Sequence, residues 1–328
     1  MNKISIHINC WMHKLSDERW NPSATRLLRK AVYCWCLVNT LILLPDAPEF
    51  WSTTALTPAT PPEIVDVQKW SHLLDMPLLQ NSYGYFIAAQ IILLVAGMAC
   101  IYPRVISVLI YFLTINIDNK VYVILDGGNN LIHLFLLYFI LIDPSKKTAV
   151  QKAGLGGMLN NGFTNLAFLM CRLQVVMMYL IAGLSKVGGV LWQNGTAIYY
   201  TLQVDEYTHP LAKDLVSRYT ILAVMGTYIT LLYQVMFPWL VWNKKMRPWL
   251  LSVGSCIHLQ ISFVMGLFMF GFAIAVAYLS FAGEKFAERI LRGPDRLLYF
   301  IKSLFGRFRS SKSKPGTLRR WSYRKIQQ

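Results

Sequence analysis

Ionisable side chains interrupt the long apolar runs of this sequence at a few positions, where a charge is costly and is by default a functional candidate. Lys186 ends one such run, and Arg172 and Gln174 lie earlier in the same run. His258 lies well inside another apolar run. A lysine withdrawn from water can act as a general base, because desolvation disfavours its charged form, and a neighbouring histidine can relay the proton.

A polar turn precedes a further apolar run and offers a carboxylate, two amides and an imidazole. Its residues are Asp126, Asn129 and Asn130, followed one helical turn later by His133. Amides of this kind can orient an apolar ring substrate through hydrogen bonds. A ligand of quinone size would reach such a site directly from the bilayer.

Each of these residues also has a structural interpretation. A terminal lysine such as Lys186 commonly extends to the lipid headgroups, and a single buried histidine such as His258 is more often hydrogen-bonded than catalytic. Asp126 with its following glycines makes a good turn and helix cap. Arg172 suits an ion pair or a carbonyl ligand. The residues alone therefore predict a polar cavity and leave these alternatives open.

The segments that must position these residues are apolar and long. A span needs about 20 residues to cross the hydrocarbon, fewer where its ends are buried in protein, and it must be helical because a lipid-exposed backbone has to satisfy its own hydrogen bonds. The apolar runs are Leu27–Leu44, Tyr83–Tyr102, Val105–Leu125, Leu131–Ile142, Leu166–Lys186, Tyr219–Trp242 and Trp249–Ala282. The last run suits two crossings, with Gly266 or Gly271 at the turn. We therefore expect an all-α polytopic transmembrane helical bundle of about eight spans, with seven as the alternative.

Composition agrees with a membrane protein. Of the 328 residues 55% are hydrophobic and 15% are charged, and the mean hydropathy is +0.41. A soluble domain carries about a quarter charged residues, so this chain is too apolar for one. The formal net charge is +16, and residues 284–328 hold 13 Lys or Arg against 3 acids, a net charge of +10.

Loop charge predicts the orientation. The first 30 residues hold six Lys or Arg and two acids, whereas Pro45–Ser82 holds five acids and one Lys. We expect both termini in the cytoplasm, which requires an even number of spans and favours eight. Residues 1–26 form a cytoplasmic segment, 27–283 the transmembrane domain and 284–328 a basic cytoplasmic tail. Lys186, Asp126 and His258 then lie on the outer side, where they could converge on one outward-opening cavity.

Two further signals bear on partners. The basic tail mixes Lys and Arg with aromatic residues, and after a membrane span we expect it to bind anionic lipid headgroups and not nucleic acid. The six cysteines form no CxxC pair and have no spacing to histidine that suits zinc, so no metal is expected.

One stretch resembles a known family. Arg172-x-Gln174, then Tyr179, then Ala182-Gly183-x-x-Lys186 and Trp192-x-x-Gly195 are similar in order and spacing to the core motif of the HTTM (horizontally transferred transmembrane) superfamily. That superfamily includes the membrane domain of vitamin K-dependent γ-glutamyl carboxylase and its shorter bacterial relatives. The resemblance covers roughly residues 26–283.

The resemblance implies a chemistry. In the carboxylase the lysine of this motif deprotonates reduced vitamin K, and reaction with O₂ gives a strong base that removes a proton from a substrate glutamate before CO₂ is added. By motif position Lys186 would be that base and His258 the downstream catalytic histidine. Asp126, Asn129, Asn130, His133, Trp192 and Gly195 would bind substrate or quinone, with Arg172, Gln174 and Tyr179 as the structural motif.

The sequence departs from the family pattern at two places, and the second departure favours an alternative. In the carboxylase a histidine directly follows the Asn-Asn pair, whereas Leu131 follows Asn130 here and leaves the role of His133 open. Gln234 stands where relatives carry an acid. The leading hypothesis is a carboxylase- or epoxidase-like enzyme in a bacterial inner membrane, acting on a peptide or a lipid-soluble substrate. The alternative is a non-enzymatic membrane factor for maturation or export of a secreted, antimicrobial-type peptide.

Overall fold

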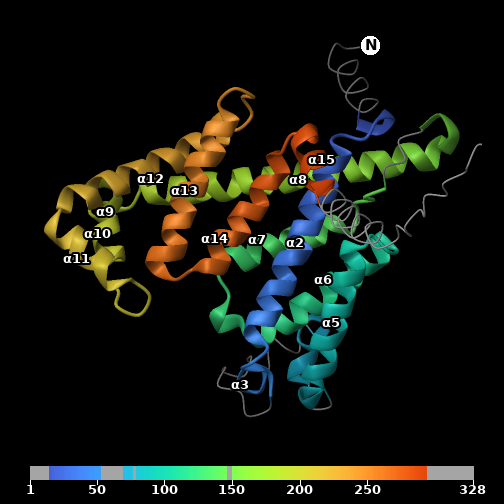
Figure 1. The fold of residues 1–328 in the computed structure, drawn as a ribbon, viewed down its shortest axis with the longest axis horizontal. Coiled ribbons are helices and arrows are strands. Elements are labelled where there is room, and N and C mark those ends of the chain that lie inside the picture. Colours follow the sequence, from blue (N-terminus) through green and yellow to red (C-terminus); the bar gives the residue numbers. More distant parts are fainter. Residues whose placement is uncertain (1–14, 53–68, 77–78, 146–149, 294–328) are drawn as a thin grey trace, which may run out of the picture.

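The computed structural model describes residues 15–52, 69–76, 79–145 and 150–293. Within these ranges the regular structure is helical and contains no strand (Figure 1), which confirms the all-α expectation for this part of the chain. Residues 1–14 and most of the basic tail lie outside the described residues.

Eight of the described helices form the body of the molecule, and shorter ones connect them (Figure 1). The eight are α2 (Pro22–Leu43), α5 (Tyr83–Met98), α6 (Pro103–Lys120), α7 (Gly127–Phe139), α8 (Val150–Val187), α12 (Thr220–Leu240), α13 (Arg247–Met265) and α14 (Phe268–Tyr278). The connecting α-helices are α3 (Ala47–Trp51), α9 (Val190–Gln193), α10 (Ala197–Thr201) and α11 (Pro210–Arg218), and α15 (Glu284–Leu291) follows α14. Short 3₁₀ turns cover Lys69–Ser71, Leu73–Asp75, Gln80–Ser82, Tyr122–Ile124 and Leu279–Phe281.

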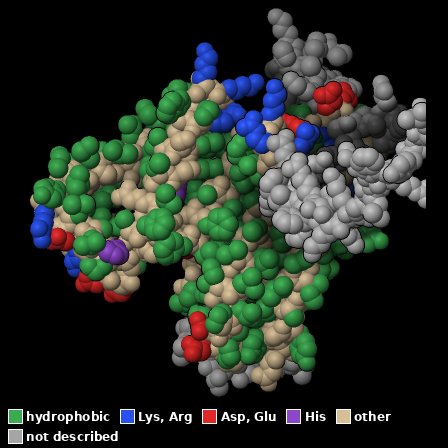
Figure 2. All heavy atoms as spheres, in the orientation of Figure 1, with side chains coloured by type: hydrophobic (Ala, Val, Ile, Leu, Met, Phe, Trp, Pro, Cys, Tyr) green, Lys and Arg blue, Asp and Glu red, His purple; other side chains and the backbone are tan. Residues whose placement is uncertain are grey.

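Three of these helices are long and apolar enough to cross a membrane. They are Gly154–Val187 within α8, Thr220–Leu240 and Arg247–Met265. Two shorter apolar helices are Tyr83–Met98 and Phe268–Phe281. Figure 2 shows hydrophobic side chains over the flanks of the helices. The described part of the chain is thus compatible with a membrane protein.

The long C-terminal apolar run is divided into two helices at Gly266. Gly266 has a φ of 69°, in the left-handed region that favours glycine, so α13 ends there and α14 begins at Phe268. Gly271, the other candidate for this turn, lies inside α14. A Cβ there would come within 1.9 Å of the Ser262 hydroxyl, so Gly271 allows α14 to pack closely against α13.

Charged side chains gather at the ends of the helices, where both signs occur. Figure 2 shows Lys and Arg at the upper edge, near the α12–α13 turn, and acidic side chains at the lower tip, near α3. We call the first the basic end; its residues are Arg19, Arg26, Arg29, Arg104, Lys244, Lys245 and Arg247. We call the other the acidic end. Asp46, Glu49 and Asp75 lie there with Lys120, which pairs with Asp75, and the loop before α11 holds Asp205 and Glu206, with Lys213 paired to Asp205.

Hydrogen bonds show which helix termini meet at the basic end. Arg29, near the start of α2, donates to the Pro103 carbonyl at the start of α6 at 2.6 Å and to the Ile142 carbonyl after α7 at 3.4 Å. Glu284, at the start of α15, accepts from the Ser23 amide at 2.8 Å. Four segments that are distant in sequence are therefore joined at one end of the bundle.

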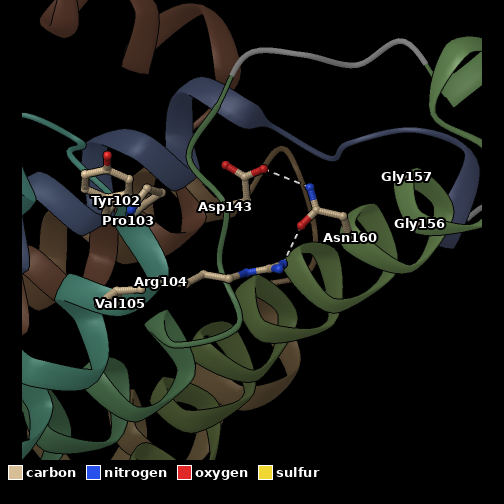
Figure 3. Close-up of a pocket in the computed structure, with 8 residues that line it drawn as sticks. All are labelled: Tyr102, Pro103, Arg104, Val105, Asp143, Gly156, Gly157 and Asn160. Carbon is tan, nitrogen blue, oxygen red and sulfur yellow. Dashed lines mark hydrogen bonds between the residues drawn. The ribbon is translucent and has the colours of Figure 1, made fainter.

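An ion pair anchors the N-terminal segment to the same end. Arg19 Nη2 lies 2.8 Å from Asp143 Oδ2, and Asn160 Nδ2 donates to the same oxygen at 2.8 Å. Figure 3 shows Asn160 between Asp143 and Arg104, at the rim of a cleft of about 660 Å³. The cleft is lined by Tyr102, Pro103, Arg104, Val105, Asp143, Gly156, Gly157 and Asn160.

The Asp143 carboxyl is strongly held in its charged form. Burial disfavours that form, but hydrogen bonds from Asn160, Arg19 and the Ser145 amide, together with the Arg19 charge, outweigh burial. They hold the pKa of this carboxyl well below its usual range.

We expect Asp143→Asn to lower the melting temperature in detergent at pH 7. A carboxyl whose pKa is lower in the folded state stabilises that state above its unfolded pKa of about 4, and this contribution is lost as the pH falls below that value. The difference in melting temperature between variant and parent should therefore become smaller as the pH falls below about 4. Asp214→Asn, in an exposed pair with Arg218, is the matched control and should change little. If Asp143→Asn and the parent have the same melting temperature at pH 7, the Arg19–Asp143 ion pair does not stabilise the fold.

Candidate functional site

One face of α8 carries three polar residues of the motif. Arg172, Tyr179 and Lys186 follow one another at intervals of seven residues. Seven residues are close to two helical turns, so the three side chains share one face. We call this set the α8 stripe. It runs from near the middle of the helix to its C-terminal end, and each member meets a different partner.

The middle of the α8 stripe lies in a buried hydrogen-bonded cluster. The Tyr179 hydroxyl lies 2.7 Å from His258 Nε2 and 2.5 Å from the Tyr278 hydroxyl. The Tyr278 hydroxyl lies 2.9 Å from that of Tyr233, which donates to the Leu250 carbonyl at 3.2 Å. We call Tyr179, Tyr233, Tyr278 and His258 the phenol–imidazole cluster; their exposed fractions are only 2% to 7%. The cluster links α8, α12, α13 and α14.

A glycine and packed aromatic rings surround this cluster. A Cβ at Gly254 would lie 2.0 Å from the Tyr233 hydroxyl and 2.2 Å from that of Tyr278, so the absence of a side chain there lets both hydroxyls approach α13. The Tyr179 ring packs on Phe237 with 4.2 Å between centroids and meets Tyr233 edge to face at 5.5 Å. Aromatic pairs of this geometry add about 0.5–1.5 kcal/mol each beyond burial.

The basic-end member of the stripe is a carbonyl ligand. Arg172 Nε donates to the Ser280 carbonyl at 2.7 Å, and its guanidinium lies 4.6 Å from the centre of the Phe168 ring. Gln174 lies beside it and accepts from the Tyr138 hydroxyl at 3.3 Å. Both contacts tie α8 to neighbouring segments.

The last member of the stripe, Lys186, stands at the C-terminal end of α8. Its ammonium donates to the Ala182 carbonyl at 3.3 Å and lies 5.2 Å from the Trp192 ring. Trp192 is held there because the chain reverses into α9 directly after Gly189. Gly195 has a φ of 72°, and a Cβ there would lie 3.0 Å from the Tyr228 ring. Within the described ranges no carboxylate pairs with Lys186.

The polar turn before α7 is a helix cap. Asp126 Oδ1 accepts from the amides of Gly128 at 2.6 Å and Asn129 at 3.1 Å, and Asn129 Oδ1 accepts from the Asp126 amide at 3.2 Å. This reciprocal arrangement is a capping box. The Asn130 side chain is exposed, whereas His133 Nε2 lies 2.6 Å from Asp118 Oδ2 on α6.

The structure brings some of the candidate residues together and separates others. The Phe270 ring lies 5.5 Å from the His258 ring, and the Phe270 backbone packs against Gly128. The capped turn and His258 therefore flank the same residue of α14. Lys186 is set apart, since in the described part of the chain no hydrogen bond or ion pair joins it to Asp126, His133 or His258.

Three residues of this region were missed by reasoning from the sequence. Tyr233 and Tyr278 lie in apolar runs, and a buried tyrosine hydroxyl needs a partner, which is the signal that could have found them. Asp118 is an ionisable residue within the apolar run Val105–Leu125, and the rule that selected Lys186 applies equally to it.

Comparisons with known proteins are sparse. No family model matches the chain, and no solved structure matches it. A Bacillus subtilis (strain 168) protein named "Uncharacterized protein YitO" is 26% identical over 212 residues. The matched region is 60% of this chain and 65% of that protein, so it spans less than two thirds of the relative's length. The relative's printed name assigns no activity.

We expect Gly254→Ala to lower the free energy of unfolding by about 1–3 kcal/mol, the usual cost of overpacking. The new methyl group would displace the hydroxyls of both Tyr233 and Tyr278. Gly84→Ala is the matched control, because a Cβ there meets nothing within 4 Å and alanine is favoured in helices. Unfolding in mixed micelles measures both variants, and equal stability of the two would contradict the close packing described.

Proposed function

We propose that this chain is a polytopic membrane protein of the carboxylase-like HTTM superfamily, and that it modifies a peptide or a lipid-soluble substrate with Lys186 as the base. The observation that carries the proposal is the α8 stripe. The motif residues Tyr179 and Lys186 share one helix face, and Tyr179 bonds to His258, the residue assigned to the downstream part of the family pattern.

The surroundings of Lys186 are consistent with a base that a lipid-soluble ring compound can reach. Exposed apolar side chains surround it: Leu184, Val187 and Val190 are 60%, 47% and 67% exposed. The Trp192 ring beside the amine offers an aromatic face. With no carboxylate to hold its proton, this amine can release the proton to water and then, as the neutral base, take one from a bound ligand.

A reduced quinone suits this setting. When bound, it would supply the reactive oxygen chemistry that carboxylation requires, with O₂ and CO₂ as co-substrates. Lys186 would take a proton from the quinol hydroxyl, and Trp192 would stack on the ring. The secreted peptide or other acceptor would approach from the same side. The N-terminal end of α7 would also contact the substrate or quinone. The groups there are the Asp126 cap, the exposed Asn130 and the Asp118–His133 pair.

The topology that we propose has eight spans with both termini in the cytoplasm. In this topology the eight main helices would cross the membrane in alternating directions, and basic loops favour the cytoplasmic side. Helices α7 and α14 are shorter than the roughly 20 residues of a lipid-exposed span, but most of their residues are buried by other helices. Anionic lipids of the bacterial inner membrane would then contact the basic end and the tail.

Cysteine labelling in intact cells tests this orientation. A membrane-impermeant maleimide should react with Asp205→Cys and not with Lys244→Cys, because these exposed residues lie at the acidic and the basic end. Labelling of both residues only after lysis, or of Lys244→Cys alone in intact cells, would contradict the topology.

We expect Lys186→Ala to abolish the mass change that the parent protein causes in its secreted peptide, and to weaken binding of a reduced naphthoquinone to the purified protein. The reason is loss of the base and of the cation above Trp192. Lys213→Ala, in an exposed pair with Asp205, is the control and should behave as the parent does. If Lys186→Ala retains full biological function and unchanged quinone binding, the base assignment fails and the non-enzymatic maturation or export factor is favoured.

A further inference from the structure

The four contacts of the phenol–imidazole cluster form an unbranched chain that ends on a backbone carbonyl. From one end to the other it runs from His258 Nε2 to the hydroxyls of Tyr179, Tyr278 and Tyr233 and then to the Leu250 carbonyl, with steps of 2.7, 2.5, 2.9 and 3.2 Å. Each phenol has one proton to donate, and a carbonyl can only accept.

These rules give the chain a single direction. Tyr233 must donate to Leu250, so its contact with Tyr278 requires Tyr278 to donate. The proton of Tyr278 is then committed, and Tyr179 has to donate to it. The proton of Tyr179 is in turn committed, so His258 has to donate from Nε2. All four hydrogen bonds exist together only in this arrangement.

The direction of the chain determines the state of the histidine. A neutral imidazole has one N–H, so donation from Nε2 leaves Nδ1 as a bare acceptor. His258 is 7% exposed, and its Nδ1 has no hydrogen-bond partner among the described residues. The nearby Ser262 hydroxyl cannot serve, because it donates to the His258 carbonyl at 2.9 Å.

The opposite direction is less favourable for two reasons. It would break the hydrogen bond between Tyr233 and Leu250, and it would put a proton on Nδ1 that has no acceptor. A buried donor without a partner costs about 1–3 kcal/mol.

We propose that the three phenols lock His258 in the Nε2–H tautomer, so that Nδ1 is the atom of the cluster that accepts a hydrogen bond or a proton from a hydroxyl-bearing apolar ligand. The tautomer rests on the contacts of the cluster alone. The ligand rests on the proposed function, in which a reduced quinone supplies such a hydroxyl. Tyr233 and Tyr278 are then positioning residues that act on the imidazole through Tyr179.

The nitrogen NMR spectrum of the full-length protein, labelled with ¹⁵N-histidine and held in nanodiscs, tests the tautomer. The His258 resonances are assigned by their absence from His258→Asn. In the parent we expect a directly bonded proton on Nε2 and a chemical shift typical of a non-protonated nitrogen on Nδ1. A proton on Nδ1, alone or together with Nε2, would overturn the proposal.

Phenylalanine variants test the lock. Tyr278→Phe interrupts the chain and frees the Tyr179 proton to point at His258, and Tyr233→Phe removes the link to the Leu250 carbonyl. Both should transfer a measurable share of the population to the Nδ1–H tautomer. Tyr228→Phe is the matched control on α12, since its hydroxyl bonds to Gln193, and it should leave the spectrum unchanged. Retention of the parent spectrum in both cluster variants would overturn the lock.

The ligand is tested separately. A reduced naphthoquinone should move the Nδ1 resonance, and its dimethyl ether, which has no hydroxyl, should not. Equal effects of the two compounds, or no effect of either, would overturn the ligand assignment and leave the tautomer standing. Lys186→Ala should keep the parent tautomer, so failure of Lys186 as a base is distinguishable from failure of the lock.

Discussion

The Tyr179 hydroxyl connects three helices in the middle of an apolar bundle, and its two hydrogen bonds join α8 to α13 and to α14. A polar group in such surroundings cannot rely on water and has to be satisfied within the protein. That requirement accounts for the close approach of α13 at Gly254, where the hydroxyls of Tyr233 and Tyr278 leave no room for a side chain. One buried phenol thus belongs to a set of contacts that joins four helices.

The same requirement governs the polar groups at the two ends of the helices. At the basic end, arginine side chains bind backbone carbonyl groups at the ends of other helices. Arg172 binds the Ser280 carbonyl just after α14, and Arg29 binds the Pro103 carbonyl at the start of α6. Near the acidic end, the partly buried His133 is satisfied by Asp118. In the described part of the bundle these polar residues tie segments together, whereas Lys186 bonds within its own helix and lies against the Trp192 ring.

Much of the architecture could be predicted from the sequence. The helical class follows from the apolar runs, and Gly266 was one of two glycines expected to divide the last run. Arg172, Tyr179 and Lys186 of the motif recur every seven residues, and this spacing explains why they share a face. These features are local, since they depend on the period of one helix or on the backbone freedom of one residue.

What the sequence did not reveal depends on contacts between distant segments. Tyr233 and Tyr278 are ordinary members of apolar runs until the fold places them beside Tyr179. The expected convergence of Lys186, Asp126 and His258 is only a prediction about the outer cavity, and the side-chain contacts join just two of the three regions, through Phe270. Length and hydropathy identify three candidate spans among the described helices, fewer than the eight that the apolar runs predict.

The most direct test of the central claim is a double-mutant cycle between Tyr179→Phe and His258→Asn, measured by reversible unfolding in mixed micelles. Each change removes one side of the 2.7 Å contact. The account predicts a coupling free energy of about 0.6–1.7 kcal/mol, the range of hydrogen bonds between membrane helices. If the losses of unfolding free energy in the two single variants sum to the loss in the double variant within about 0.3 kcal/mol, the account is contradicted.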